Sequence, residues 1–309
     1  MTLKQTFKRS FAWAATISVL LAVPVVGATT WVLCPSSAET QDRASSVLYD
    51  AAEIASHRRL AILIPGSLNS VDIYAGANRW RSVGYALAYY RFPGMDGRAL
   101  DGTVEIRAAA ADIIRFSREF PDKEIYLVGY STGAQIALQV ASELPDRVRK
   151  VAAISSAVGF PETIWVSFRV GIDLARRALH LRTLDISRIW LDYYRVLLFG
   201  RERFELPAPT QQAAEIIASR RQRIVTPTSR LICAHFGGLA LGTGVSGPVK
   251  GVEVRFFHGS EDPVVPVRAV RNFAAKLSES SIEVLDGHGH IPMLTAPDLF
   301  ERVRRFLES

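Results

Sequence analysis

Short, mostly apolar runs recur along the chain, separated by polar or glycine-rich segments. Their length and their content of β-branched and aromatic residues are typical of strands buried on both faces of a sheet. The pattern predicts six such strands, at Leu60 to Ile64, Tyr85 to Tyr89, Ile125 to Val128, Val151 to Ile154, Val254 to Phe257 and Ile282 to Leu285.

Helical patterns lie between several of these strands. From Val104 to Phe120, apolar residues recur at steps of three and four, which places them on one face of a helix. Ala134 to Leu144 is a second helix, rich in small residues, and helical spacing returns after Pro297. Strands that alternate with helices favour an α/β fold with a mostly parallel sheet and helices on both faces.

The alternation stops between residues 161 and 250, where helix follows helix. The expected helices are Ile164 to Leu179, Ile186 to Phe199 and Thr210 to Arg223. This segment holds 13 basic and 7 acidic side chains, a net of +6, out of a net charge of +7 for the whole chain. Two interpretations stay open: a solvated helical face, or a lid that faces an anionic membrane or an acidic substrate.

The first 34 residues are expected to be a signal peptide or a membrane anchor. The segment from Phe11 to Leu33 is apolar and uncharged, and it follows Lys8 and Arg9, as in an export signal. Small residues from Val26 to Ala28 would suit cleavage, whereas the longer apolar run suits a retained anchor. The rest of the chain is expected outside the cytoplasm, either membrane-anchored or, after cleavage, secreted or periplasmic.

Composition narrows the classes of function. With 49% hydrophobic and 22% charged residues, the chain is typical of globular proteins rather than disordered ones. Two cysteines, Cys34 and Cys233, are too few for a disulfide framework, and no Cys/His cluster has the spacing of a zinc site. Basic and aromatic residues do not interleave as in nucleic-acid platforms. No metal, cofactor or nucleic-acid partner is therefore expected.

The candidate chemistry begins at the sequence Gly129-Tyr130-Ser131-Thr132-Gly133. It follows a predicted strand and opens a predicted helix, which is the setting of a nucleophile elbow. A serine hydroxyl needs a base, and the base needs a carboxylate to orient it. Both follow later strands: the segment from His258 to Pro266 supplies an acid, and the segment from Asp286 to His290 supplies a histidine.

From residue 58 to 309 the chain resembles the α/β-hydrolase superfamily. The resemblance rests on the elbow, the acid loop, the histidine loop and the order serine, aspartate, histidine. It implies Ser131 as nucleophile, Asp262 as acid and His290 as base. It also implies an α/β-hydrolase core of residues 35–160 and 251–309, with residues 161–250 as a helical cap.

Several neighbouring residues compete for these roles or match none. His288 competes with His290, and Glu261 with Asp262; the family pattern favours His290 and Asp262. His57 and His235 match no catalytic position and are interpreted as surface or core histidines.

Acyl transfer also needs two backbone N–H groups to bind the oxyanion. Thr132 is expected to supply one of them and Ser67 the other. Here the chain departs from the family, because Pro65 stands where a histidine is common before the glycine of this loop.

The leading hypothesis is a serine hydrolase that cleaves an ester, thioester or amide, with a hydrophobic or lipid-like small molecule as substrate. Membrane association is expected through the amino-terminal segment. Two alternatives are a membrane-tethered binding or scaffold protein that keeps the fold without turnover, and an acyltransferase that uses the same acyl-enzyme.

Overall fold

The structure is a computed structural model of the 309-residue chain. It describes residues 45–309 except for residues 101, 157–158, 160–161, 226, 229, 233, 236–244 and 246. The expected signal or anchor, Cys34 and Cys233 lie outside the described residues. Among the helices within the described ranges, none is both long and apolar enough to cross a membrane.

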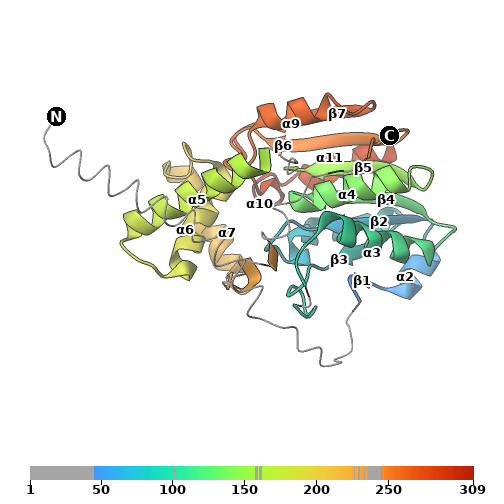
Figure 1. The fold of residues 1–309 in the computed structure, drawn as a ribbon, viewed down its shortest axis with the longest axis horizontal. Coiled ribbons are helices and arrows are strands. Elements are labelled where there is room, and N and C mark those ends of the chain that lie inside the picture. Colours follow the sequence, from blue (N-terminus) through green and yellow to red (C-terminus); the bar gives the residue numbers. More distant parts are fainter. Residues whose placement is uncertain are drawn as a thin grey trace, which may run out of the picture.

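A seven-stranded sheet forms the centre of the described part of the chain (Figure 1). Its strand order is β1-β3-β2-β4-β5-β6-β7, and all neighbours are parallel except β1 and β3. The strands are β1 (Val47–Tyr49), β2 (Arg59–Ile64), β3 (Tyr85–Tyr90), β4 (Glu124–Tyr130), β5 (Val148–Ile154), β6 (Glu253–Gly259) and β7 (Ser280–Leu285). All six predicted strands are present, and the mostly parallel α/β fold is confirmed.

Strand β1 was not predicted. It is only three residues long and pairs antiparallel with β3, so its apolar pattern is too short to indicate a strand.

The helices are α2 (Ala51–Ser56), the 3-10 helix η1 (Val71–Val83), α3 (Ile106–Arg118), α4 (Thr132–Glu143), α5 (Glu162–Leu181), α6 (Ile186–Phe199), α7 (Pro207–Arg220), α9 (Val267–Ala274), α10 (Pro292–Thr295) and α11 (Leu299–Glu308). Sequence patterning missed η1 and the short helices α2, α9 and α10.

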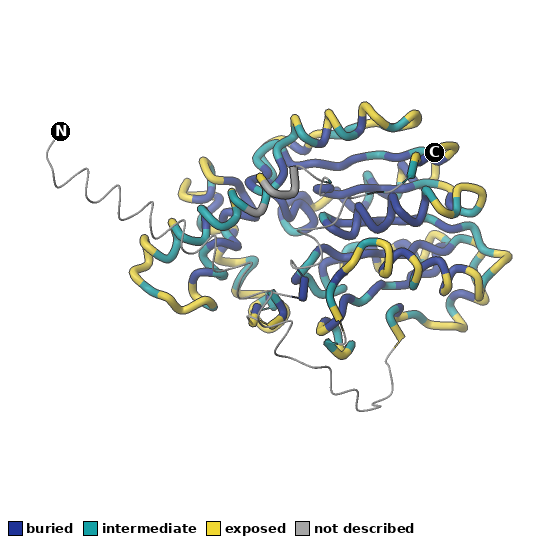
Figure 2. Tube along the Cα trace, in the orientation of Figure 1, coloured by how far each residue is buried: buried dark blue, intermediate teal, exposed yellow. Residues whose placement is uncertain are grey.

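Two apolar layers cover the two faces of the sheet. Side chains of β2 alternate between them: Leu60, Ile62 and Ile64 pack in the layer that contains α3, α4 and α9, whereas Ala61 and Leu63 pack in the layer that contains η1, α6 and α11. Burial on both faces explains why the strands appear in the sequence as continuous apolar runs. Figure 2 shows the central strands as largely buried, whereas the edge strand β7 is mostly of intermediate exposure or exposed.

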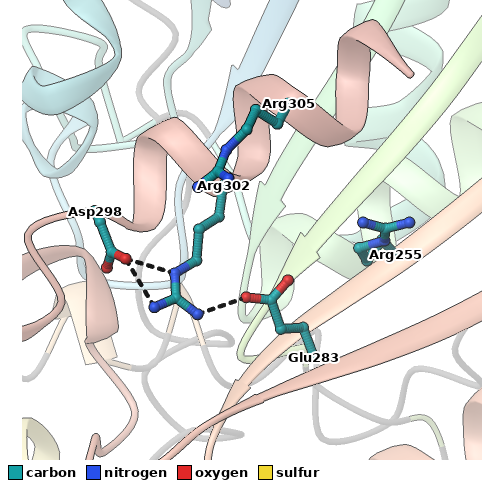
Figure 3. A pocket seen from close by; sticks show the side chains of 5 residues that line it. All are labelled: Arg255, Glu283, Asp298, Arg302 and Arg305. Atoms are coloured by element: carbon teal, nitrogen blue, oxygen red, sulfur yellow. Dashed lines mark hydrogen bonds and ion pairs between the residues drawn. The ribbon is translucent and has the colours of Figure 1, made fainter.

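Ion pairs connect the carboxyl-terminal helix to strand β7 at the edge of the sheet. Arg302 on α11 donates to Glu283 on β7 at 2.8 Å and pairs with Asp298 at 2.7 Å. These residues line a surface pocket of about 340 Å³ together with Arg255 and Arg305 (Figure 3). Since the Arg302 guanidinium is engaged by both carboxylates, we interpret this pocket as a structural ion-pair cluster.

Helices α5, α6 and α7 lie between β5 and β6 in the chain. Figure 1 shows them grouped at one end of the sheet, beside the carboxyl ends of the parallel strands. In the described part of residues 161–250 there is no strand, as the pattern predicted. In parallel sheets, ligands bind at the carboxyl ends of the strands, so the helical insertion lies beside the expected place of a site.

Gly133 offers a test of this packing. A Cβ at this position would collide with the backbone carbonyl oxygens of Ile64 and Pro65, so Gly133→Ala should lower the free energy of unfolding by roughly 2 kcal/mol or more. The matched control is Gly102→Ala, because a Cβ there meets no atom within 4 Å. Urea denaturation midpoints measure both; equal midpoints for the two variants would contradict the packing described here.

Candidate active site

The elbow after β4 holds Ser131 in a conformation that side chains rarely adopt, with φ 52° and ψ −115°. Neither flanking glycine has room for a side chain: a Cβ on Gly129 would meet the Gly133 carbonyl, and one on Gly133 would meet the end of β2. The tight turn therefore requires glycine at both positions. Backbone strain of this kind persists where the surrounding structure holds it, and it is frequent at functional sites.

Three strand ends bring Ser131, His290 and Asp262 together. Ser131 Oγ lies 3.0 Å from His290 Nε2, and His290 Nδ1 lies 2.7 Å from Asp262 Oδ2. Ser131 follows β4, Asp262 follows β6 and His290 follows β7, so each side chain comes from the carboxyl end of a different strand. The imidazole is thus aligned between a hydroxyl and a carboxylate, the arrangement that general-base activation of a serine requires.

Asp262 is buried but well provided with partners. Its Oδ1 accepts the backbone N–H groups of Val264 at 2.8 Å and Val265 at 2.9 Å. Burial alone would raise the pKa of this carboxyl, but His290, His258 and the Val265 N–H outweigh it and hold the pKa below its ordinary value. Asp262 is therefore a negatively charged carboxylate at neutral pH, and in this form it orients the His290 ring.

His258 also touches the aspartate, and sequence reasoning assigned it no role. It is fully buried at the end of β6, with Nε2 2.8 Å from the Val265 carbonyl oxygen and 3.4 Å from Asp262 Oδ2. Burial lowers the pKa of His258, which favours a neutral ring beside the carboxylate. A histidine directly after two phenylalanines of the strand, four residues before the acid, was the signal in the sequence.

The end of α6 holds the loop that carries His290. The backbone N–H groups of Gly289 and His290 donate to the carbonyls of Leu198 and Leu197 at 2.9 and 2.7 Å. A Cβ on Gly289 would collide with the Leu197 carbonyl, so only glycine permits this approach. The helical insertion thus forms part of the wall of the site.

The competing residues point elsewhere. His288 Nδ1 contacts Thr295 Oγ1 at 2.8 Å, and burial lowers the pKa of this histidine. The Glu261 carboxylate accepts from the Ser260 hydroxyl at 3.2 Å. The structure therefore brings His290 and Asp262 to Ser131, and brings neither His288 nor Glu261 there.

Ser67 and Thr132 lie side by side next to the elbow. Their hydroxyl oxygens are 3.0 Å apart, and Thr132 is the first residue of α4. Among the described residues, no hydrogen bond engages the backbone N–H of either residue. The amino terminus of α4 adds a partial positive charge at this point, so the pair is placed where an oxyanion could be bound.

His235 supports the same loop from the helical insertion. Its Nδ1 accepts the backbone N–H of Leu68 at 3.2 Å, and its Nε2 lies 3.0 Å from the Pro93 carbonyl oxygen. Leu68 has a left-handed backbone with φ 61° and directly follows Ser67. Two such contacts require the neutral ring with its proton on Nε2, and burial lowers the pKa of His235 accordingly.

This finding refines the interpretation of His235. Of the two expectations, a surface or a core histidine, the second is confirmed, because His235 is buried. His235 also supports the loop in which Pro65 replaces the histidine common in the family. No local sequence pattern indicates this contact, because 167 positions separate the two partners. In the described ranges, no group of three or more His, Cys, Asp or Glu side chains could hold a metal ion.

Comparison with known proteins places this geometry in context. An uncharacterised protein of Mycobacterium tuberculosis is 24% identical over 209 residues, which are 60% of this chain and 57% of that protein. The chain therefore spans little more than half the length of this curated relative.

Solved structures share the fold at low identity. An esterase from Exiguobacterium antarcticum matches with a TM-score of 0.63 at 18% identity, over 85% of this chain and 95% of that one. A membrane phospholipase A described as a bacterial virulence factor matches with a TM-score of 0.54 at 17% identity, over 99% of this chain and 98% of that one. The sequence profile described as "Alpha/beta hydrolase family" matches residues 61–303, most of the chain, and the chain therefore belongs to the α/β-hydrolase family.

Proposed function

We propose that this protein is a serine hydrolase that cleaves a carboxylic ester through an acyl-enzyme. The observation that carries the proposal is the unbroken line of contacts from Ser131 Oγ through His290 to Asp262, at 3.0 and 2.7 Å. A scaffold protein without turnover would have no need to hold a serine at φ 52° beside a buried histidine and carboxylate.

In the proposed reaction, Ser131 Oγ attacks the carbonyl carbon of the ester while His290 Nε2 takes the hydroxyl proton. His290 then gives this proton to the leaving alcohol. In the second half, His290 takes a proton from water as the water attacks the acyl carbon, and it returns the proton to Ser131 Oγ as the carboxylic acid leaves. Asp262 keeps the proton-bearing Nδ1 of His290 in place and stabilises the imidazolium. The N–H groups of Thr132 and Ser67 bind the oxyanion of each tetrahedral intermediate.

The proposed substrate is a hydrophobic or lipid-like ester. The turn of helix α6 whose backbone carbonyls accept from the His290 loop contains Leu197, Leu198 and Phe199, and these side chains are buried in the apolar layer on this face of the sheet. The esterase and the membrane phospholipase A among the similar structures support an ester as the bond that is cleaved. We further propose that residues 161–250 form a cap over the site.

Covalent labelling of the full chain in detergent with a fluorophosphonate probe tests the activated serine. Wild type should label, and Ser131→Ala and His290→Ala should not, because the first lacks the nucleophile and the second its base. The matched control is His288→Ala, whose ring contacts Thr295 rather than Ser131, and which should keep its labelling.

Turnover of p-nitrophenyl esters of graded chain length should fall by roughly 10⁴-fold in Ser131→Ala and His290→Ala. Product analysis in the presence of alcohols separates hydrolysis from acyl transfer. A folded wild type that neither labels nor turns over any ester would refute the proposal.

His235 gives a second, graded test. His235→Ala removes the acceptor for the Leu68 N–H and should lower kcat by roughly tenfold with little change in KM, since a loosened oxyanion loop weakens binding of the transition state. His235→Asn keeps an acceptor near the position of Nδ1 and should recover most of the loss. Equal losses in both variants would show that the ring serves packing alone.

Stability should depend on pH through the same residue. The pKa of His235 in the folded state lies below its ordinary value of 6.5, so below about pH 6.5 the unfolded chain binds a proton that the folded chain does not. Unfolding temperatures should therefore be level above this pH and decline below it. In His235→Asn the free energy of unfolding should decline less steeply with falling pH, by up to about 1.4 kcal/mol per pH unit. Part of the slope should remain, because the pKa values of His258 and His288 are lowered as well. Identical slopes would contradict the buried neutral ring.

A further inference from the structure

The turn between α5 and α6 exposes large apolar side chains to an unusual degree. Leu184 is 90% exposed, Leu179 75% and Ile186 47%, and Leu181 is exposed beside them. We call residues 179–188 the α5–α6 tip. Figure 2 shows it as a mostly exposed stretch at the outer end of the insertion, on the side away from the sheet. A cluster of exposed leucines of this kind marks a contact surface, because single exposed apolar residues are common but contiguous groups are not.

Basic side chains accompany these leucines. The tip holds two arginines and one aspartate, and Arg176 and Arg177 lie just before it. Arg182 and His180 are exposed within the apolar group, and Arg188 lies one turn into α6 with 77% of its side chain exposed. Arg176, 65% exposed, lies 3.8 Å from the buried Asp173.

The single acid of the tip has a local structural task. Asp185 is the N-cap of α6: its carboxylate accepts the backbone N–H groups of Ser187 and Arg188 at 2.9 and 3.3 Å, and it lies 3.5 Å from the Arg188 guanidinium. Arg177 points inward, where it pairs with Asp192 and lies over the ring of Phe204. The outer surface of the tip is therefore apolar and positively charged.

We propose that the α5–α6 tip docks on an anionic lipid membrane. Leucine and isoleucine side chains would enter the boundary between headgroups and acyl chains, while the arginines contact lipid phosphates. The apolar and basic combination favours lipid over a second copy of the chain, since like charges on two tips would repel each other.

Docking at this place has a consequence for the active site. Helix α6 begins in the tip, and its last turn accepts the backbone hydrogen bonds of Gly289 and His290. Its 14 residues span roughly 20 Å, at about 1.5 Å per residue. One rigid helix therefore connects the docking surface to the loop of His290, and a membrane at the tip would lie at a set distance from the site.

Depth-dependent fluorescence quenching tests the proposal on the full chain reconstituted into vesicles. An environment-sensitive fluorophore is attached to Ser187→Cys in the tip or, as the control position, to the exposed Glu119 as Glu119→Cys, in a background with Cys34→Ser and Cys233→Ser. With vesicles of phosphatidylcholine and phosphatidylglycerol, nitroxide-labelled lipids should quench the fluorophore at position 187 and leave the one at position 119 unaffected.

Substitutions separate the apolar and charged contributions. Leu179→Ser with Leu184→Ser should abolish the quenching at position 187. Arg182→Gln with Arg188→Gln should weaken it in anionic vesicles only, and high salt should do the same. The matched control combines Leu48→Ser on β1 with Arg107→Gln and Arg118→Gln on α3, which removes an exposed apolar side chain and two exposed arginines elsewhere and should change nothing.

Each contrary result overturns the proposal. Absence of quenching at position 187 would show that the tip stays in water. Protection of the fluorophore from aqueous iodide in detergent alone would show that protein covers the tip: a second copy if the protection grows with protein concentration, and a segment of the same chain if it does not. None of these readings requires turnover, so they stand whether or not the proposed hydrolase activity is found; unfolding temperatures confirm that each variant is folded.

Discussion

Ser131 occupies a backbone conformation that an L-residue adopts only where the surrounding structure enforces it. Here the packing of the turn against the central strands enforces it. The turn is so tight that Gly129 and Gly133 touch neighbouring backbone, and Gly133 lies directly against the end of β2. The buried strands on either side keep the turn from relaxing. The position of the hydroxyl, the start of α4 and the approach of the oxyanion loop all depend on this one constraint.

The helical insertion and the core meet at the loops that carry His290 and Ser67. The end of α6 accepts hydrogen bonds from the loop of His290, and His235 accepts one from the loop of Ser67 and Leu68. The loop of His290 and the loop of Ser67 and Leu68 are therefore both held in part by the insertion. In such an arrangement, a shift of the insertion would change the geometry of the site itself, beyond any effect on access to it.

Burial and hydrogen-bond partners together set the protonation states of the titratable groups at the site. Asp262 keeps its charge because two backbone N–H groups and two histidines surround it, while burial keeps His258 and His235 neutral. Hydrogen bonds and neighbouring charges thus favour the charged form of Asp262, whereas burial favours the neutral form of the two histidines. The arginines of the insertion differ in exposure: the Arg201 side chain is 37% exposed in its ion pair with Asp173, whereas Arg182 and Arg188 of the tip are exposed, with Arg188 beside Asp185.

The sequence by itself determined the positions of six parallel strands, the order of the loops that carry Ser131, Asp262 and His290, and the choice of these three residues as candidates. Burial on both faces leaves continuous apolar runs, and the elbow requires glycines at fixed local spacing, so both can be recognised from neighbouring residues. Only the tertiary structure decided the roles of His235 and His258, the contact of α6 with the His290 loop, the short strand β1 and the exposure of the leucines at the tip. These features depend on which residues distant in the chain come together, and an apolar residue looks the same in a sequence whether a core covers it or not.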